Sequence, residues 1–248
     1  MATRRRLDLE MARRGLAPSR EGAQRLIMAG RVRVNSQPAL KADQNVDERS
    51  AIALVGGAPE YASRGGIKLA AALDHFDVDP AGRHAMDVGA STGGFTDVLL
   101  RRGAAHVIAL DVGYGQIADR LRRDARVTVL DRTNIRLVPA GSLPYAPDLV
   151  VIDVSFISLR LVLPPVLELS APDVKVVALV KPQFEVGKGK VGKGGVVRDD
   201  AERRRAVDEV LEFAAGLKLE VVGAVEAAIR GTAGNQEFIA AMYRPAAH

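Results

Sequence analysis

The chain has 248 residues, of which 48% are hydrophobic and none is cysteine. This length can bury a sizeable core as one large domain or two smaller ones, and without cysteine there are neither disulfides nor thiolate metal sites. The longest apolar candidate, residues 149–169, contains Asp153, Arg160 and two prolines, so we do not expect it to span a membrane. The four histidines show no ligand spacing. We therefore expect a globular, cytoplasmic protein that needs no metal.

Positive charge is concentrated at the amino end of the chain. Residues 1–50 hold 11 Lys and Arg against 6 Asp and Glu, and the remaining residues hold 24 of each sign, out of 35 and 30 overall. The whole net charge of +5 therefore falls in the first fifth of the chain. This concentration indicates a polyanionic partner, bound through phosphate contacts that do not depend on sequence.

The first 55 residues predict a small α/β domain. Helices are expected over residues 7–14 and 19–28, the second with Ser19 as its N-cap. Alternating apolar residues predict an edge strand over 31–35 and a further strand over 51–55. The first aromatic residue of the chain comes after this segment, so contacts with a nucleic acid would depend on its backbone and shape rather than on base stacking.

This segment resembles the RNA-binding domain named after ribosomal protein S-four. The resemblance is carried by Arg6-Leu7-Asp8, Gly15-Leu16, Ser19-Arg20, Ala23, Leu26-Ile27, Gly30, Val32, Val34-Asn35 and Lys41. It implies an RNA-facing surface formed by Arg4, Arg6, Arg20, Arg25 and Lys41. An ordinary solvated face is the alternative, and the charge imbalance favours RNA.

The run Gly56-Gly57-Ala58-Pro59 interrupts every periodicity and predicts a linker. We expect an RNA-binding domain over residues 1–55, the linker over 56–62 and a second domain over 63–248.

The second domain alternates strand and helix patterns. Strands are expected over residues 84–88, 107–111, 127–130, 149–153, 174–180, 220–227 and 237–243, and helices over 66–76, 96–102, 117–122, 159–169 and 200–217. The loop between the last two strands is too short for a parallel crossover, so these strands should form an antiparallel hairpin. The pattern predicts an α/β, Rossmann-like class I methyltransferase fold: a mainly parallel sheet with one antiparallel strand and helices on both faces.

The first strand of this domain runs into a glycine-rich turn that opens a helix. Gly89, Gly93 and Gly94 allow positive φ and a close approach of a ligand, and the helix N-terminus offers free N–H groups. Asp111 ends the next strand, where a carboxylate can bind both hydroxyls of a ribose. S-adenosyl-L-methionine fits these features better than NAD, because it has a ribose but no phosphate.

Asp131 and Asn134 follow the third strand. We expect them to meet the adenine, although capping of the next segment explains either residue equally well. The full set of predicted cofactor-binding residues is Asp87, Gly89, Ala90, Ser91, Gly93, Gly94, Phe95, Asp111, Asp131, Asn134 and Asp153.

Two other glycine-rich stretches imitate nucleotide sites, and we reject both. Residues 187–193 have the spacing of a P-loop, but Gly194 stands where a Ser or Thr must hold magnesium. Residues 113–118 match a loose dinucleotide pattern, but they follow the second strand of the sheet rather than the first.

Four polar residues together predict a catalytic group: Lys68, Asp153, Lys181 and Glu237. Asp153 and Lys181 directly follow apolar strands, which places both at the ligand-binding edge of a parallel sheet; a return to solvent would explain either one alone. A ribose 2′-hydroxyl is a poor nucleophile, and an unprotonated lysine close to other positive charges can take or polarise its proton. We expect Lys181 to act on the hydroxyl and Asp153 to position Lys181 or the cofactor amine. Lys68 and Glu237 would orient Lys181 and tune its charge.

This group resembles the Lys-Asp-Lys-Glu tetrad of ribose 2′-O-methyltransferases such as the FtsJ group. Together with the amino-terminal domain, nearly the whole chain resembles the TlyA (haemolysin A) family. The runs 89–96, 111–116 and 181–189 carry the resemblance. It implies S-adenosyl-L-methionine-dependent methylation of cytidine 2′-hydroxyls in ribosomal RNA, within assembled ribosomal subunits.

Other interpretations remain open. Lys188 and Lys190 lie in a lysine- and glycine-rich loop, 188–195, which we expect to close over bound RNA; a solvated loop is the alternative. A non-catalytic RNA-binding ribosome assembly factor is the chief alternative function, since no pattern in the sequence demonstrates turnover. A membrane-active haemolysin is suggested only by the family name, because the chain has no spanning or strongly amphipathic segment.

Overall fold

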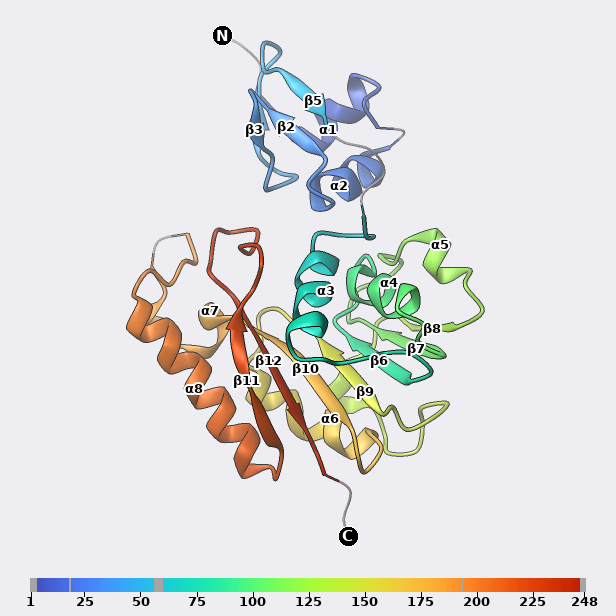
Figure 1. The fold of residues 1–248 in the computed structure, drawn as a ribbon. Coiled ribbons are helices and arrows are strands. Elements are labelled where there is room, and N and C mark those ends of the chain that lie inside the picture. The colour runs from blue at the N-terminus through green and yellow to red at the C-terminus, as the bar shows by residue number, and fades with distance from the viewer. Residues whose placement is uncertain (1–3, 18, 56–59, 193, 246–248) are drawn as a thin grey trace. The chain divides into compact units, whose positions relative to one another are not determined.

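The structure is a computed structural model that describes residues 4–17, 19–55, 60–192 and 194–245. Contacts between Cα atoms divide the chain into two compact units, one up to Gly66 and one from Ile67 onward (Figure 1). The predicted limits at residues 55 and 63 stay a prediction, and residues 56–59 of the predicted linker lie outside the described ranges.

The described residues of the first unit form two helices and two small sheets. Its helices are α1 (Leu7–Arg13) and α2 (Arg20–Met28), and its strands are β1 (Arg5–Arg6), β2 (Val32–Val34), β3 (Gln37–Pro38), β4 (Asn45–Val46) and β5 (Ile52–Leu54). The Ser19 side chain accepts a hydrogen bond from the Gly22 N–H at 3.0 Å, which confirms the predicted N-cap. The core of the first unit contains Leu7 and Met11 of α1, which pack with residues of α2 and β2.

The predicted edge position of residues 31–35 is wrong. β2 is the central strand of its sheet, between β3 and β5. Asn35 and Ser36 both have positive φ, 50° and 67°, as a tight two-residue hairpin turn requires. This turn folds β3 back onto β2, and a strand of only two residues has too little periodicity to be recognised in a sequence.

A seven-stranded sheet forms the centre of the second unit, in the order β11-β12-β10-β9-β6-β7-β8. Its strands are β6 (His84–Val88), β7 (His106–Leu110), β8 (Val127–Leu130), β9 (Leu149–Ile152), β10 (Lys175–Val180), β11 (Glu220–Glu226) and β12 (Phe238–Tyr243). β12 is antiparallel to both neighbours, whereas β10, β9, β6, β7 and β8 pair in parallel. The predicted mainly parallel sheet, with its single reversed strand and final hairpin, is confirmed.

Helices cover both faces of this sheet (Figure 1). They are α3 (Gly65–His75), α4 (Gly94–Arg101), α5 (Asp119–Arg122), α6 (Leu163–Leu169), α7 (Pro182–Glu185) and α8 (Asp200–Gly216), with the 3-10 turns η1 (Ile135–Leu137), η2 (Leu159–Leu161) and η3 (Lys188–Lys190). The predicted continuous helix over 159–169 is wrong, because it is split into η2 and α6. Pro164 and Pro165 stand in the first turn of α6, where a missing N–H leaves no intrahelical bond unmade.

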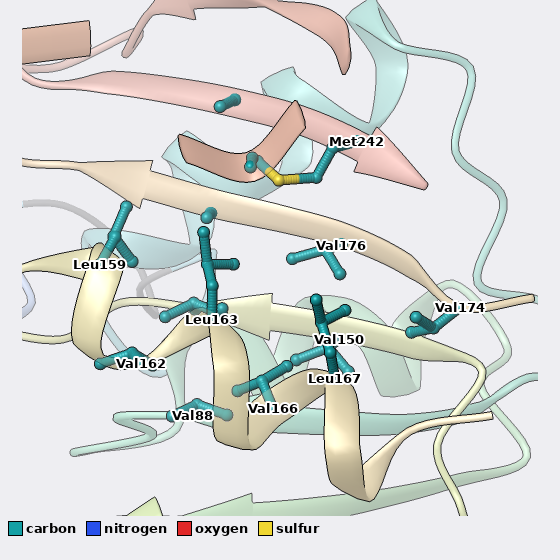
Figure 2. Packing of buried hydrophobic residues seen from close by; sticks show 14 of the residues in the cluster. Val88, Val150, Leu159, Val162, Leu163, Val166, Leu167, Val174, Val176 and Met242 are labelled. Atoms are coloured by element: carbon teal, nitrogen blue, oxygen red, sulfur yellow. The ribbon is translucent and has the colours of Figure 1, made fainter. Parts of the chain in front are cut away.

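One core cluster lies on one face of the sheet, under η2, α6 and α8. Alternate strand residues, among them Val88, Val150 and Val176, point toward Leu163 and Val166 (Figure 2). All five are buried, and each such side chain contributes about 1.5–3 kcal/mol by leaving water. Because the central strands are covered on both faces, they are apolar at nearly every position rather than at every second one.

The loops that follow β6 and β9 approach each other closely at the carboxyl edge of the sheet. Gly89 follows β6 with φ at +87°, and an added Cβ would overlap the carbonyl oxygen of Asp153, which follows β9. The position therefore requires glycine for its backbone angle and for its lack of a side chain.

Replacing Gly89 with alanine tests this double requirement. Gly89→Ala should lower the free energy of unfolding by roughly 3 kcal/mol, because backbone strain and steric overlap add. Gly82→Ala is the matched control: Gly82 has φ at +72° but open space around it, so it should lose only about 1 kcal/mol. Equal losses in denaturant unfolding of the two variants would contradict the close approach.

Candidate functional site

A pocket of about 480 Å³ opens at the carboxyl edge of the sheet. Its wall includes five of the predicted cofactor residues: Gly89, Ser91, Asp111, Asn134 and Asp153. The volume lies within the usual range for small-molecule sites, and the wall combines a few polar groups with apolar side chains.

Asp111 ties the glycine-rich turn to the end of β7. Its Oδ2 accepts a hydrogen bond from the Ser91 N–H at 2.8 Å, and its Oδ1 accepts one from the Gly113 N–H at 2.7 Å. A carboxylate has about four lone-pair positions, so each oxygen can still accept a bond from a ligand hydroxyl in the pocket. Ser91 itself has φ at +47°, which turns the chain sharply around the Asp111 carboxylate.

Asp87 lies beneath the turn and does not line the pocket. Its side chain is fully buried, and its Oδ2 accepts hydrogen bonds from the Thr96 N–H at 2.9 Å and the Thr96 hydroxyl at 2.7 Å. These bonds anchor the start of α4. Its Oδ1 has no hydrogen-bond partner in the described part of the chain, and burial raises the pKa of Asp87 to about 7.

The remaining predicted cofactor residues also lie off the pocket wall. Ala90, Gly93, Gly94 and Phe95 are buried and shape the turn and the first turn of α4. Asp131 forms an ion pair with Arg122 at 2.9 Å, and Asn134 caps η1 by accepting from the Arg136 N–H at 3.1 Å. The capping explanation for Asn134 therefore holds alongside its position in the wall.

The four predicted catalytic residues form two ion pairs. Lys68 Nζ lies 2.5 Å from Glu237 Oε2, and both side chains are buried. Lys181 Nζ lies 2.6 Å from Asp153 Oδ1 and donates a hydrogen bond to the Ser155 hydroxyl at 2.8 Å. The contact with Asp153 is close but poorly aligned for a hydrogen bond, so its attraction is chiefly electrostatic.

The reversed strand explains why a residue so late in the chain belongs to this edge. Val180 of β10 is paired with Phe238 of β12, and the two strands run in opposite directions. The residues immediately beyond this pair, Lys181 and Glu237, therefore leave the sheet side by side. α3 supplies Lys68 to the same edge, 169 positions away from Glu237 in the sequence.

Two further residues contact Glu237 and were missed from the sequence. Gln183 Nε2 donates to Glu237 Oε1 at 3.5 Å, a long hydrogen bond. A Cβ on Gly231 would overlap Glu237 Oε1, so glycine at this position leaves room for the carboxylate. A glycine in a loop predicts only a turn, and no pattern in the sequence indicates which side chain needs the space.

Phe156 is a third residue that the sequence did not reveal. Its side chain is 90% exposed, its φ is +65°, and its ring lies 5.2 Å from that of Phe184. It lines both the pocket and an adjoining hollow of about 520 Å³, whose wall also includes Gln183 and Arg136. An exposed aromatic ring between two cavities is available for contact with a flat ligand.

Glu185 holds the loop that carries Phe156. Its Oε2 accepts from the Ser158 hydroxyl at 2.6 Å and its Oε1 from the Leu159 N–H at 2.8 Å. Burial raises the pKa of Glu185. The loop after β9 is thereby joined to α7, the helix that follows Lys181.

The predicted RNA-binding residues differ in their surroundings. Arg4, Arg25 and Lys41 are exposed on the first unit, whereas Arg6 and Arg20 both contact the buried Asp8. In the second unit Lys190 forms an ion pair with Glu202 at 2.8 Å, and the side chain of Lys188 lies outside what the structure describes.

Over the described ranges, no group of three or more His, Asp or Glu could hold a metal ion. None of the helices in those ranges is long and apolar enough to cross a membrane.

Comparison with known proteins gives two family matches. Residues 61–244 match the FtsJ-like methyltransferase family, and residues 5–52 match the S4 domain. The chain is 50% identical to the 16S/23S rRNA (cytidine-2'-O)-methyltransferase TlyA of Mycobacterium tuberculosis, over 96% of this chain and 89% of the relative. It is 36% identical to Hemolysin A of Brachyspira hyodysenteriae, over 95% of this chain and 98% of the relative.

A solved structure shares the architecture. The "Putative hemolysin from Streptococcus thermophilus" is 38% identical and has a TM-score of 0.77, with 99% of this chain and 90% of that chain covered.

The raised pKa of Asp87 makes stability depend on pH. Between about pH 4 and pH 7 the folded chain holds a proton that the unfolded chain has released, so the free energy of unfolding should fall as pH rises through this window. Asp87→Asn cannot titrate. Its stability relative to wild type should therefore increase by roughly 3–4 kcal/mol from pH 4 to pH 8, measured by denaturant unfolding.

Asp97→Asn is the matched control for this measurement. Burial acts to raise the pKa of Asp97 but is outweighed by hydrogen bonds from Arg120 and Arg101, so the pKa is lowered. The carboxylate stays ionised throughout the window, and the stability difference between this variant and wild type should be flat between pH 5 and 8. A flat difference for Asp87→Asn as well would contradict its raised pKa.

Proposed function

The chain belongs to the TlyA family of FtsJ-like methyltransferases with an S4 domain, and from this we propose that it methylates the 2′-hydroxyl of cytidine in ribosomal RNA. The observation that carries the proposal is the pair of ion pairs, Lys68–Glu237 and Lys181–Asp153, beside a pocket built on the glycine-rich turn. The relative in Mycobacterium tuberculosis bears the name of that reaction. A ribosomal substrate would place the protein in the cytoplasm.

We propose the domain limits on the same grounds. Residues 1–55 form the RNA-binding domain, 56–62 the linker and 63–248 the methyltransferase domain. The S4 match over 5–52 and the FtsJ-like match over 61–244 support this division.

The pocket is the proposed site of S-adenosyl-L-methionine, which supplies a reactive methyl group on a positively charged sulfur. Asp111 is suited to the ribose, because both of its oxygens keep lone pairs free, and Asn134 to the adenine. Gly89 and Ser91 bring the backbone close to the ligand. The other predicted cofactor residues support this site through the shape of the turn or from its surroundings: Asp87, Ala90, Gly93, Gly94, Phe95 and Asp131.

Lys181 is the proposed residue that acts on the ribose hydroxyl. Lys181 suits this role because its amine donates a hydrogen bond to the hydroxyl of Ser155, a residue of the pocket wall. Asp153 holds the Lys181 amine toward the pocket that it lines. The Lys68–Glu237 pair lies beside Lys181 through the strand register and places two opposite charges, fixed by their mutual contact, next to the reacting amine.

The RNA is the proposed ligand of Arg4, Arg6, Arg20, Arg25, Lys41, Lys188 and Lys190. Their charge suits phosphate contacts that are independent of sequence. Lys190 would exchange its ion pair with Glu202 for a phosphate, a small cost for an exposed pair. We propose assembled ribosomal subunits as the form in which the RNA is presented.

Phe156 is proposed to stack on the base of the nucleotide that is modified. Its ring is exposed between the cofactor pocket and the second hollow, and the ring of Phe184 lies 5.2 Å from it in the wall of that hollow. A base extruded from an RNA strand exposes a flat face that an aromatic side chain can cover.

Methyl transfer to purified ribosomal subunits tests the proposed reaction. Wild type should transfer labelled methyl from S-adenosyl-L-methionine to the small or large subunit, and Lys181→Ala should lower kcat by about 10²- to 10⁴-fold, the usual effect of losing an acid–base group. Lys175→Ala, at the opposite end of β10, is the control and should keep wild-type activity. Full activity of Lys181→Ala would indicate that another residue acts on the ribose hydroxyl. No transfer by wild type to either subunit would instead favour a non-catalytic RNA-binding assembly factor.

Phe156→Ala tests the stacking role. Loss of one base–aromatic contact costs about 1–3 kcal/mol, so KM for the ribosomal subunit should rise roughly 5- to 150-fold while the affinity for S-adenosyl-L-methionine changes less. Leu137→Ala is the control, because Leu137 is 77% exposed but lines neither cavity. Equal effects of the two substitutions on KM would rule out a specific role for Phe156.

A further inference from the structure

Asp8 is a buried carboxylate on which side chains from two neighbouring elements converge. It is fully buried near the start of α1. Arg6 of β1 donates from Nε to Oδ1 and from Nη2 to Oδ2, both at 3.0 Å. Arg20 and Gln24 of α2 donate to Oδ2 from Nε at 3.0 Å and from Nε2 at 2.8 Å.

The two arginines keep most of their donors for another partner. A guanidinium carries five N–H donors, of which Arg6 gives two and Arg20 gives one to Asp8. In the described ranges no other acceptor is recorded for either guanidinium, and the side chains are 40% and 49% exposed. Asp8 therefore fixes the inner edges of both guanidinium groups and leaves their outer edges facing solvent.

Glu10, two residues further along α1, provides an internal comparison. It is equally buried and binds Arg13 and Arg14. The Arg14 guanidinium, however, also donates to the carbonyl oxygens of Ser50 at 2.8 Å and Asp47 at 2.9 Å. Arg14 thus links α1 to the loop that contains Asp47 and Ser50. Within the described residues, the arginines bound to Asp8 have no such second acceptor.

We propose that Asp8 is a positioning residue that holds Arg6 and Arg20 as a paired clamp for a phosphate of the RNA backbone, with Gln24 completing the cradle. The inference rests on the proposed RNA substrate and deepens it. A planar guanidinium matches the geometry of a phosphate, and fixing two of them before binding removes part of the entropy cost of ordering long side chains. The hydrogen bond from Arg6 holds the pKa of Asp8 well below its usual range, so the carboxylate stays ionised.

Net charge and the positioning role predict opposite effects of Asp8→Asn on RNA binding. A carboxylate beside two arginines lowers the local positive charge, so Asp8→Asn should tighten RNA binding if only net charge mattered. A positioning role requires that binding weaken although the domain becomes more positive.

The test measures binding of the full chain to the ribosomal subunit that wild type methylates, between 50 and 200 mM KCl. Asp8→Asn should weaken binding about tenfold and reduce the slope of log affinity against log salt by about one to two, as expected for loss of one or two phosphate contacts. Glu10→Gln makes the same charge change at an equally buried site and should bind at least as tightly as wild type. Circular dichroism of each variant checks that the first unit folds.

A double-mutant cycle separates positioning from general support of the fold. In an Arg6→Ala/Arg20→Ala background, Asp8→Asn should cause no further loss, because the residues through which it acts are absent. Arg20→Lys is a second probe that leaves the core intact: it keeps the charge but loses the Nε bond to Asp8, so it should weaken binding several-fold.

The outcomes distinguish this inference from the proposed function. Unchanged or tighter binding by Asp8→Asn, unchanged binding by Arg20→Lys, or a full loss that persists in the arginine-free background would each overturn the role of Asp8. If wild type neither binds nor methylates either subunit, the proposed substrate itself is wrong, and the proposed phosphate-binding role of Arg6 and Arg20 is then rejected as well.

Discussion

The antiparallel pairing of β12 with β10 places Glu237 at the edge where the parallel strands end. In a purely parallel sheet, the residue preceding a strand lies at the opposite edge from the residues that follow its neighbours. Reversal of one strand therefore brings a carboxylate that precedes β12 beside Lys181, which follows β10. The Lys68–Glu237 ion pair, and with it the buried half of the proposed catalytic cluster, depends on this single reversal.

The buried charges near the carboxyl edge of the sheet are stabilised in two different ways. Lys68 and Glu237 neutralise each other inside the protein, which limits the desolvation cost of burying both. Within the described residues, Asp87 has only the Thr96 N–H and hydroxyl as donors and no cation beside its carboxylate, so burial favours its protonated form. The hydrogen bonds that anchor the start of α4 are thus accepted by Asp87, a carboxyl group whose ionised form is destabilised by burial.

The first unit uses buried carboxylates in another way. Asp8 and Glu10 lie on the same short helix and each binds arginines at its surface. Among these arginines, and within the part of the chain that the structure describes, only Arg14 also donates to the backbone of a neighbouring loop. The excess of basic residues in the first 50 positions suggested an RNA-binding surface. Which arginines are free to bind and which brace the fold follows from their acceptors, and those are set by the fold.

The sequence by itself determined the order of the longer strands and helices, the glycine-rich turn and the acids and lysines at strand ends, because these features rest on local periodicity and spacing. It did not determine the split of the helix at Pro164, the short strand after Asn35, the burial of Asp87 or the exposure of Phe156. Those depend on backbone angles and on which distant surfaces cover a residue. Only the tertiary structure paired Lys68 with a carboxylate 169 positions away, since strand order and direction, rather than local sequence, decide which chain ends meet at one edge of the sheet.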